Sequence, residues 1–549
     1  MAVPAATQVQ RPSIKQEEDM RKAKYARLGG VRLALGALAA TPAQAAPSGT
    51  LTVVMPNFGR EMLDLAKTSS QDLQYTGHTN EPLVGTAPDG TLSPERGLAE
   101  SWSMSEDARV YTFTLRPGVR WHDGKPFTSD DVVFSLAERF RAKDAICTFC
   151  RLLQPIDAVE APDELTVVVT LKEPDPLFLA VLSGRDGDIR MVPRHNYRPV
   201  EDGFEMIGDP VGTGPWIYES FSRGVDMVLR ANADYWDKER VPEFGTLRLV
   251  PRSQPSTRLS MVRSGEADIA FVDPRQAEDA RAAGLRIMTS EGAAISSLEF
   301  YGCWQEEMLC HQQDFREALV RAIDMPTIFK HIYPEGTARE IASSYWPVTQ
   351  SLGFDPEIEP YAYDPERAKE LLKKVGYDGT TVKIWSVRTI SIPEAPEIME
   401  LVDGYLRAAG INTEITPMEF GAFRPRYASN PQTWETEFAA HLYLNAPGVR
   451  PTVLPNLRVA VIGQDVGGLI QGYWDLPGIN KIWSDLIKMT DVEDLENALR
   501  SLNHKMYSEF VNHPVAIKSQ VAVVGPRVAG WTPSIHGFGW HLETVRKGQ

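Results

Sequence analysis

Regular alternation of helices and strands between residues 364 and 415 constrains the fold more than any other feature of the chain. Four elements are predicted there: a helix over 364–376, a strand over 382–385, a helix over about 397–409 and a strand over 411–415. Asp364 and Pro365 provide the cap and first turn of the first helix, and Gly376 ends it. A β-α-β run of this kind requires parallel strands joined by a right-handed crossover. We therefore predict an α/β fold.

The first half of the chain has a different pattern, since its predicted strands are joined by proline and glycine turns. Apolar residues alternate with threonines over 110–115, which indicates a strand with one buried face, and residues 165–171 are β-branched enough for another. A chain of 549 residues is too long for one core. We predict one mixed α/β domain before about residue 300 and a second from there to about residue 505.

Charge and motif content exclude several classes of protein. With 57 Lys and Arg against 73 Asp and Glu the formal net charge is −16, so nucleic acid is not an expected partner. No G-x-S-x-G, H-E-x-x-H or P-loop signature is present, which disfavours an enzyme. The ten histidines are scattered, and we expect neither a metal site nor a cofactor. Gly212-Thr213-Gly214-Pro215 is predicted to be a turn rather than a phosphate loop, because Pro215 lacks a donor N–H.

Residues 1–46 are interpreted as a targeting segment with Met20 as the expected true start. Basic side chains after Met20 precede an apolar run over 33–40 and a small-residue site that ends at Ala45, which is the plan of a secretory signal. Arg32 interrupts the apolar run, so a disordered amphipathic tail is the alternative. We expect export, with cleavage after Ala45.

Four cysteines fit an exported protein. Cys147 and Cys150 are three residues apart, and Cys303 and Cys310 seven apart. In an oxidising compartment each pair can form a local disulfide, although four cysteines permit three connectivities. A zinc site or a redox role is the alternative, and zinc would require the two pairs to meet across more than 150 residues.

Aromatic and polar side chains gather in predicted loops of the second half. The candidates are Trp385, Arg388, Phe420, Tyr443 and Asn445. Aromatic faces provide apolar contact, and an arginine provides a directed charge for a carboxylate. We hypothesise that these residues line a ligand pocket. The alternative is that Trp385 and the phenylalanines near residue 420 are core residues.

Several motifs resemble those of a known family. The matching stretches are Leu98-Ala-Glu-Ser-Trp102, residues 111–124 (YTFTLRPGVRWHDG), Asp130-Asp131-Val132, Gly212 to Trp216 and Asn232 to Trp236. In order and spacing they resemble the family 5 solute-binding proteins of ABC transporters, which serve peptides, nickel and related solutes. The resemblance covers essentially all of residues 50–530.

The resemblance implies a two-lobed periplasmic-binding-protein fold of the Venus-flytrap type, class II, with an extra subdomain in the first lobe. The expected parts are lobe I over 47–299 plus 506–549, its extra subdomain over about 83–210, and lobe II over 300–505. The chain is expected to cross between the lobes near 296–302 and near 505–520.

The resemblance also implies a function. The chain is expected to be the periplasmic solute-binding component of an ABC importer, a monomer that captures a peptide-like solute or small organic anion and delivers it to the permease complex in the inner membrane. It is expected not to be an enzyme. Two alternatives stay open: a secreted enzyme with an unrecognised active site, and a sensor that passes its ligand to a receptor.

The resemblance does not identify the solute. Peptide binders of this family usually carry an acidic residue in the stretch that corresponds to 441–447, where this chain has no Asp or Glu. An unpaired buried ammonium is costly, which argues against free peptides. Arg388 is expected to hold an anionic solute, Tyr443 and Asn445 to stack and hydrogen-bond, and Asn80 to contact the solute from the first lobe.

Overall fold

The structure is a computed structural model that describes most of the chain after residue 45. Described are residues 46–68, 72–87, 90–147, 149–184, 187, 189–347, 351–388, 392, 394–419, 423, 435–445, 453–454, 457, 461–462, 478–531 and 540–548. The predicted signal over 20–45 and the candidate Phe420 lie outside these residues. No helix in the described ranges is both long enough and apolar enough to cross a membrane.

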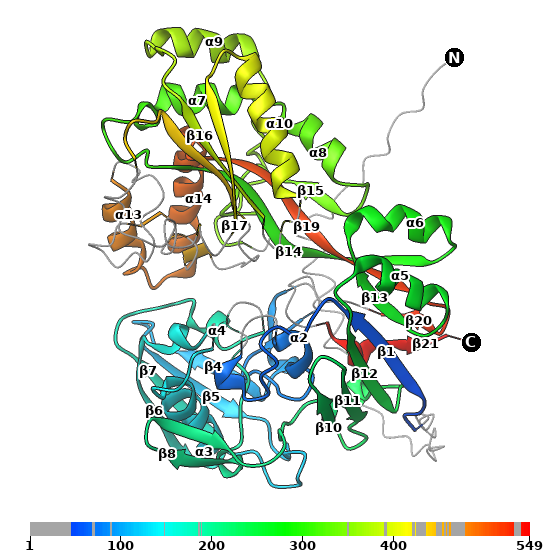
Figure 1. The fold of residues 1–549 in the computed structure, drawn as a ribbon. Helices are drawn as coiled ribbons and strands as arrows, with labels where there is room; N and C mark the ends of the chain where they lie inside the picture. The colour runs from blue at the N-terminus through cyan, green and yellow to red at the C-terminus, as the bar shows by residue number, and fades with distance from the viewer. Residues whose placement is uncertain are drawn as a thin grey trace, which may run out of the picture. The chain divides into compact units, whose positions relative to one another are not determined.

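Eleven of the described strands form one mixed sheet (Figure 1). Its order is β10 (Trp216–Ser222), β11 (Asp226–Ala231), β12 (Thr246–Pro251), β1 (Thr50–Met55), β13 (Ile269–Val272), β19 (Asn512–Val524), β14 (Arg286–Tyr301), β18 (Ala440–Asn445), β16 (Val382–Arg388) and β17 (Thr413–Glu419), with β15 (Ala338–Glu340) beside β19. β12, β1 and β13 pair in parallel, and so do β17, β16 and β18. The parallel pairing predicted for the strands of residues 382–415 is therefore confirmed.

The long strands β14 and β19 connect two hydrophobic cores (Figure 1). Leu298 of β14 and both Val515 and Ala516 of β19 belong to a core whose other buried members lie within residues 300–506. Val521 of β19 packs instead in another core with residues of β1, β12 and β13. Between these cores, Ile295 and Ile517 form a small cluster of their own with Ile341. The pairing of β14 with β19 shifts register on both sides of Ile295. The predicted lobe boundaries themselves stay a prediction.

Helices pack around the sheet in both parts of the chain. The longer ones are α5 (Pro255–Arg263), α7 (Gln313–Arg321), α8 (Met325–Ile332), α9 (Pro365–Lys374), α10 (Ala395–Ala408), α13 (Ile479–Leu486) and α14 (Val492–Ser508), and α6 (Ala277–Ala282) is shorter. Asp364 caps α9 by accepting from the Arg367 N–H, as predicted. α10 begins two residues before its predicted start, because Pro396 occupies its first turn. α10 packs against β16 and β17.

Residues 99–171 contribute a separate antiparallel sheet. Its order is β4 (Ala99–Met104), β5 (Val110–Leu115), β7 (Thr166–Leu171) and β6 (Ile156–Asp163). The alternation predicted over 110–115 is confirmed, since Tyr111, Phe113 and Leu115 are buried. Smaller elements complete the described fold: α2 (Leu73–Thr76), α3 (Ser129–Val133), α4 (Phe178–Val181), and the strand pairs β2 (Gly85–Thr86) with β3 (Leu92–Ser93), β8 (Tyr197–Val200) with β9 (Gly203–Met206), and β20 (Val528–Gly530) with β21 (Arg546–Lys547).

Candidate functional site

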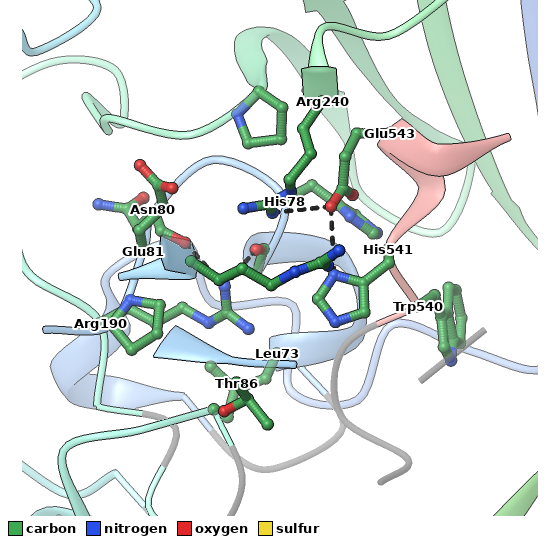
Figure 2. Close-up of a pocket in the computed structure, with 15 residues that line it drawn as sticks. Leu73, His78, Asn80, Glu81, Thr86, Arg190, Arg240, Trp540, His541 and Glu543 are labelled. Carbon is green, nitrogen blue, oxygen red and sulfur yellow. Dashed lines mark hydrogen bonds and ion pairs between the residues drawn. The ribbon is translucent and has the colours of Figure 1, made fainter. Parts of the chain in front are cut away.

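A pocket opens between the segment after α2, the turn before β10 and the C-terminal segment (Figure 2). His78 and Asn80 come from the first of these segments, and His541 and Glu543 from the last. Arg240 reaches it from the short 3-10 helix η7 (Lys238–Arg240). We call this pocket, which contains the first-lobe candidate Asn80, the arginine pocket.

Gly212 and Gly214 allow the turn before β10 to pack closely against the segment after α2, and together these two segments form one wall of the pocket. A Cβ on Gly212 would lie 1.8 Å from the Thr79 carbonyl oxygen, and one on Gly214 would lie 2.8 Å from the His78 carbonyl oxygen. The Gly214 N–H donates to the Thr79 carbonyl at 2.9 Å. Because Trp216 then begins β10, this segment is the predicted turn, and its glycines serve close backbone packing rather than phosphate binding.

A buried ion pair forms one side of the arginine pocket. Arg240 Nη2 donates to Glu543 Oε1 at 2.8 Å, and His541 Nδ1 lies 3.1 Å from the same oxygen. Burial opposes ionisation of Glu543, yet Arg240 and His541 hold the pKa of its carboxyl well below the usual range. His541 has a φ of 46°, which is uncommon for a residue other than glycine. Glu543 is therefore an ionised carboxylate with its charge already compensated.

Further polar groups in the pocket are not compensated in this way. Arg96 lines the pocket, is half-buried, and forms no hydrogen bond or ion pair with any described residue. His78 is 5% exposed, and its Nε2 has no hydrogen-bond partner among the described residues. Burial lowers the pKa of His78 to about 4, so the ring is neutral near pH 7.

Asn80 itself is held by the protein. Its Nδ2 donates to the carbonyls of Met191 at 2.9 Å and Val211 at 3.4 Å, and its Oδ1 accepts from Thr79 Oγ1 at 2.8 Å. Both donor hydrogens of the amide are thus used in fixing the wall. Asn80 supports the pocket, and its contact with a solute stays a prediction.

A second group of candidates lies on the sheet of the other core. Trp385 of β16 stands opposite Tyr443 of β18, which stands opposite Glu299 of β14, which in turn stands opposite Asn512 of β19. Side chains of residues that are directly paired point to the same face of a sheet. We call these four residues the polar row.

The aromatic segments of this region are strands, and their prediction as loops was wrong. β16 continues to Arg388, which pairs with Glu419, and β18 contains both Tyr443 and Asn445, the latter opposite Ser297. Polar residues at every second position gave these segments a loop-like composition, but the intervening Leu442 and Leu444 belong to the core. The side chain of Arg388 is outside the described part of the structure.

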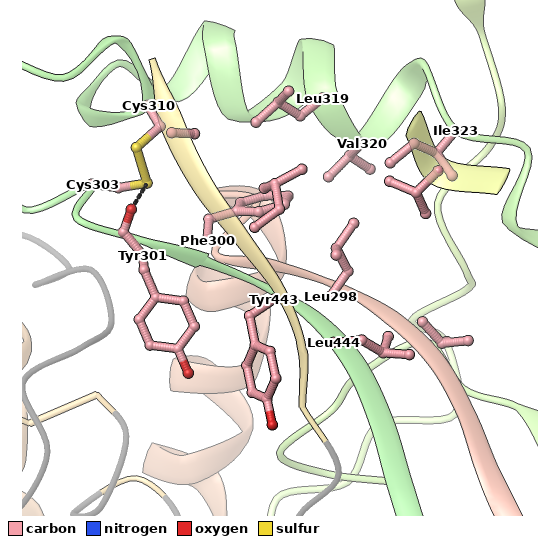
Figure 3. Close-up of a cluster of buried hydrophobic side chains, with 14 of the residues drawn as sticks. Leu298, Phe300, Tyr301, Cys303, Cys310, Leu319, Val320, Ile323, Tyr443 and Leu444 are labelled. Carbon is pink, nitrogen blue, oxygen red and sulfur yellow. Dashed lines mark hydrogen bonds between the residues drawn. A yellow bond between two sulfur atoms is a disulfide. The ribbon is translucent and has the colours of Figure 1, made fainter. Parts of the chain in front are cut away.

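The rings of the polar row are buried. Trp385 and Tyr443 are each 3% exposed, and the Tyr443 ring lies 6.1 Å from that of Tyr301 and 4.3 Å from that of Phe423. Figure 3 shows Tyr301 and Tyr443 on the side of the strands that faces away from α7. In this structure Trp385 and Tyr443 therefore have the burial expected of core residues, and their contact with a solute stays a prediction.

Glu299 is the residue of this region that sequence reasoning missed. Its carboxylate accepts from Ser297 Oγ and, at 3.2 Å to both oxygens, from Asn512 Nδ2. No described Lys, Arg or His forms an ion pair with it, and burial raises its pKa to about 7. The sequence does contain one signal for it: Glu299 is a single acidic residue within the apolar run 298–301, next to the predicted crossing between the lobes.

Two disulfides join the local cysteine pairs, Cys147 with Cys150 and Cys303 with Cys310. The second lies directly after β14, which carries Glu299, and His311 Nδ1 contacts the Cys303 carbonyl at 3.1 Å. Among the described residues, no three His, Cys, Asp or Glu side chains are grouped as metal ligands.

Comparisons with known proteins agree on one family. Residues 93–446 match the middle region of the bacterial extracellular solute-binding proteins, family 5. The chain is 28% identical over 429 residues to di/tripeptide-binding protein 2 of Pseudomonas aeruginosa, which covers 73% of this chain and 77% of that protein. It is 30% identical over 391 residues to a putative ABC transporter peptide-binding protein of Brucella abortus, and this match covers 68% of this chain and 69% of that protein.

A comparison of folds shows a binding-protein architecture. The crystal structure of the ABC transporter substrate-binding protein CtaP from Listeria monocytogenes superposes with a TM-score of 0.77 at 20% identity, and the match covers 92% of this chain and 100% of that one. The predicted two-lobed binding-protein fold is thereby confirmed. Proteins of this family bind solutes for transport and are not enzymes, as expected from the sequence. The chain belongs to family 5 of the bacterial extracellular solute-binding proteins and is the solute-binding component of an ABC importer.

Proposed function

We propose that this protein captures a peptide-like solute or a small organic anion in the periplasm and hands it, unchanged, to the importer's permease complex in the inner membrane. The solute is held between lobe I (47–299 and 506–549) and lobe II (300–505). β14 and β19, which connect the two cores, carry the hinge motion that closes the lobes. The protein acts as a monomer and, with a net charge of −16, does not bind nucleic acid.

Glu299 is the observation that carries the peptide-like part of this proposal. The stretch 441–447 lacks an acid for the amino group of a peptide, but Tyr443 stands opposite Glu299 in the sheet. An ammonium group brought beside Glu299 would ionise this carboxyl and would offset the cost of burying both charges. The name of the Pseudomonas relative, a di/tripeptide-binding protein, supports the same class of solute.

The remaining candidates have complementary roles in this proposal. Arg388 binds a carboxylate of the solute, Tyr443 and Asn445 stack and hydrogen-bond, and Trp385 and Phe420 provide apolar contact. Asn80 contributes from the first lobe, where it already holds the wall of the arginine pocket. These assignments fit the residue types, since aromatic faces and a few directed polar groups are what small-solute sites use.

A thermal-shift screen of di- and tripeptides, organic acids, sugars and nickel chelates tests the proposed function. A solute at about 100 times its dissociation constant adds about 2.7 kcal/mol of stability, which is a clear rise in the melting midpoint. We expect peptides or organic acids to raise it, mass spectrometry to recover the solute unaltered, and small-angle scattering to report a more compact protein. A chemical product would instead indicate an enzyme, and no stabilising solute at all would contradict the proposal. Permease and ATPase genes next to the gene of this protein would distinguish an importer component from a sensor.

A further inference from the structure

One apolar side chain from the region of the four-stranded sheet packs on the core of the other part of the molecule. Leu177 lies directly before α4 (Figure 1) and packs, partly buried, against the core that Leu298 shares with residues 300–506. Among the described residues before Leu298, no other hydrophobic side chain packs on that core. Leu177 therefore joins two parts of the chain that otherwise bury their apolar residues separately.

The residues that follow Leu177 pack on a different core. Phe178 is fully buried in the core formed by the four-stranded sheet, and Leu179 and Val181 pack on that same core. The core partner thus changes between Leu177 and Phe178, although the two residues are adjacent in the chain. This change sets Leu177 apart as a contact between two parts of the molecule and not as a member of its own core.

The segment before α4 is held firmly on the four-stranded sheet. The Asp175 carboxylate accepts from the Leu177 N–H at 3.0 Å, and Tyr111 Oη of β5 donates to the Asp175 carbonyl. Pro174 and Pro176 stand on either side of Asp175, and each proline ring fixes its own φ. Leu177 is therefore presented from a fixed position on this sheet.

The contact of Leu177 does not depend on the strands that cross between the proposed lobes. In the described part of the chain, the four-stranded sheet has no strand pairing with the eleven-stranded sheet. Beside the crossing strands, two ion pairs join the lobes. Lys518 of β19 pairs with Glu394 at 2.6 Å. Arg275, shortly after β13, pairs with Glu397 at 2.5 Å. A hinge rotation moves atoms least near its axis, so these pairs change less than a contact before α4 when the lobes move.

We infer that Leu177 is a clasp between the lobes, whose contact with the core of lobe II forms when the lobes close on the solute and is lost when they open. This inference rests on the proposed function in taking the lobes to move about β14 and β19. A contact that exists only in the closed state stabilises that state selectively, and it raises the affinity for the solute without touching it. The clasp also slows release of the solute, because the contact must break before the lobes open.

Removal of the Leu177 side chain tests the clasp, and Leu179→Ala is the matched control. Leu179 is also partly buried, but it packs on the core of its own sheet. With trialanine as the probe in calorimetric titration, Leu177→Ala should weaken binding about five- to tenfold, because part of a leucine's apolar burial is lost from the closed state. Leu177→Asp should weaken binding further, since a carboxylate is costly to bury on an apolar core. Leu179→Ala should bind trialanine as the wild type does.

Small-angle scattering without any solute provides a second readout. Because the clasp favours the closed arrangement, the radius of gyration of Leu177→Asp should exceed that of the wild type, whereas Leu179→Ala should match it. The melting midpoint of each variant shows that the fold is intact.

Equal affinity of Leu177→Ala and Leu179→Ala for trialanine would refute the clasp, and so would equal radii of gyration for Leu177→Asp and the wild type. A wild type that binds neither trialanine nor any solute of the thermal-shift screen would instead contradict the proposed function. The scattering comparison would then still decide on the clasp, so the two failures give different results.

Discussion

The arginine pocket and the polar row handle buried charge in opposite ways. In the pocket, the buried Glu543 is ionised because Arg240 Nη2 lies 2.8 Å from its Oε1 and His541 Nδ1 lies 3.1 Å from the same oxygen. In the polar row, Glu299 has only the neutral donors Ser297 and Asn512, and its pKa is raised to about 7. The difference shows that this fold keeps one buried carboxylate ionised by pairing it with an arginine, and favours the neutral form of another by giving it only neutral donors.

Removal of Arg240 should have the largest effect on stability. Arg240→Ala leaves Glu543 charged and buried without its main partner, which is expected to cost about 3–5 kcal/mol in the free energy of unfolding. Urea unfolding measures this cost. The control is Arg198→Ala, which breaks an exposed ion pair with Glu205 and should cost about 0–1 kcal/mol.

The comparison would fail if Arg240→Ala were no more destabilised than Arg198→Ala. A double variant, Arg240→Met with Glu543→Leu, should recover much of the lost stability, because it removes both charges together. Recovery would show that the loss came from the unpaired carboxylate and not from the missing arginine stem.

Replacement of Glu299 should have a somewhat smaller effect that depends on pH. The folded-state pKa of Glu299 is about 7, whereas its ordinary value is 4.5. Between these two pH values the folded protein therefore keeps a proton on Glu299 that the unfolded chain has lost. The stability of the wild type is therefore full below about pH 4.5 and falls as the pH rises through 7. Glu299→Gln should match the wild type near pH 4 and exceed it by about 3 kcal/mol near pH 8.

Unfolding curves across this pH range check the effect. Glu219→Gln, at an exposed carboxyl of β10, is the matched control and should follow the wild type throughout. If the difference between Glu299→Gln and the wild type does not change with pH, the carboxyl is not held in its neutral form, and the contrast between the two sites is lost.

Local sequence patterns predicted much of the fold. The β-α-β run was recognisable because its caps and apolar stripes are short-range signals, and Asp364 caps α9 in the structure as expected. The strand over 110–115 was predicted with its bounds, since alternation with one buried face depends on neighbouring residues only. The loops assigned around Trp385 and Tyr443 were wrong because strand pairing, which buries both, involves β14 and β19 far away in the chain.

The candidate sites show the same limit. Asn80 was recognised from the sequence, but its pocket was not, because Arg96, Arg240 and Trp540 come from segments more than 100 residues apart. Glu299 has no signal in residues 441–447, because the register of β14 on β18 brings this acid opposite Tyr443 from another strand. Spatial convergence of this kind has no local signature in a single sequence.

The most direct test of the account is calorimetric titration with the peptide that stabilises the protein most, compared with its N-acetyl derivative. If Glu299 is the partner of the solute's amino group, the free peptide should bind to the wild type, and both acetylation and Glu299→Gln should weaken binding by about tenfold or more. Equal affinity for the free and the acetylated peptide, in the wild type and in Glu299→Gln alike, would contradict the account.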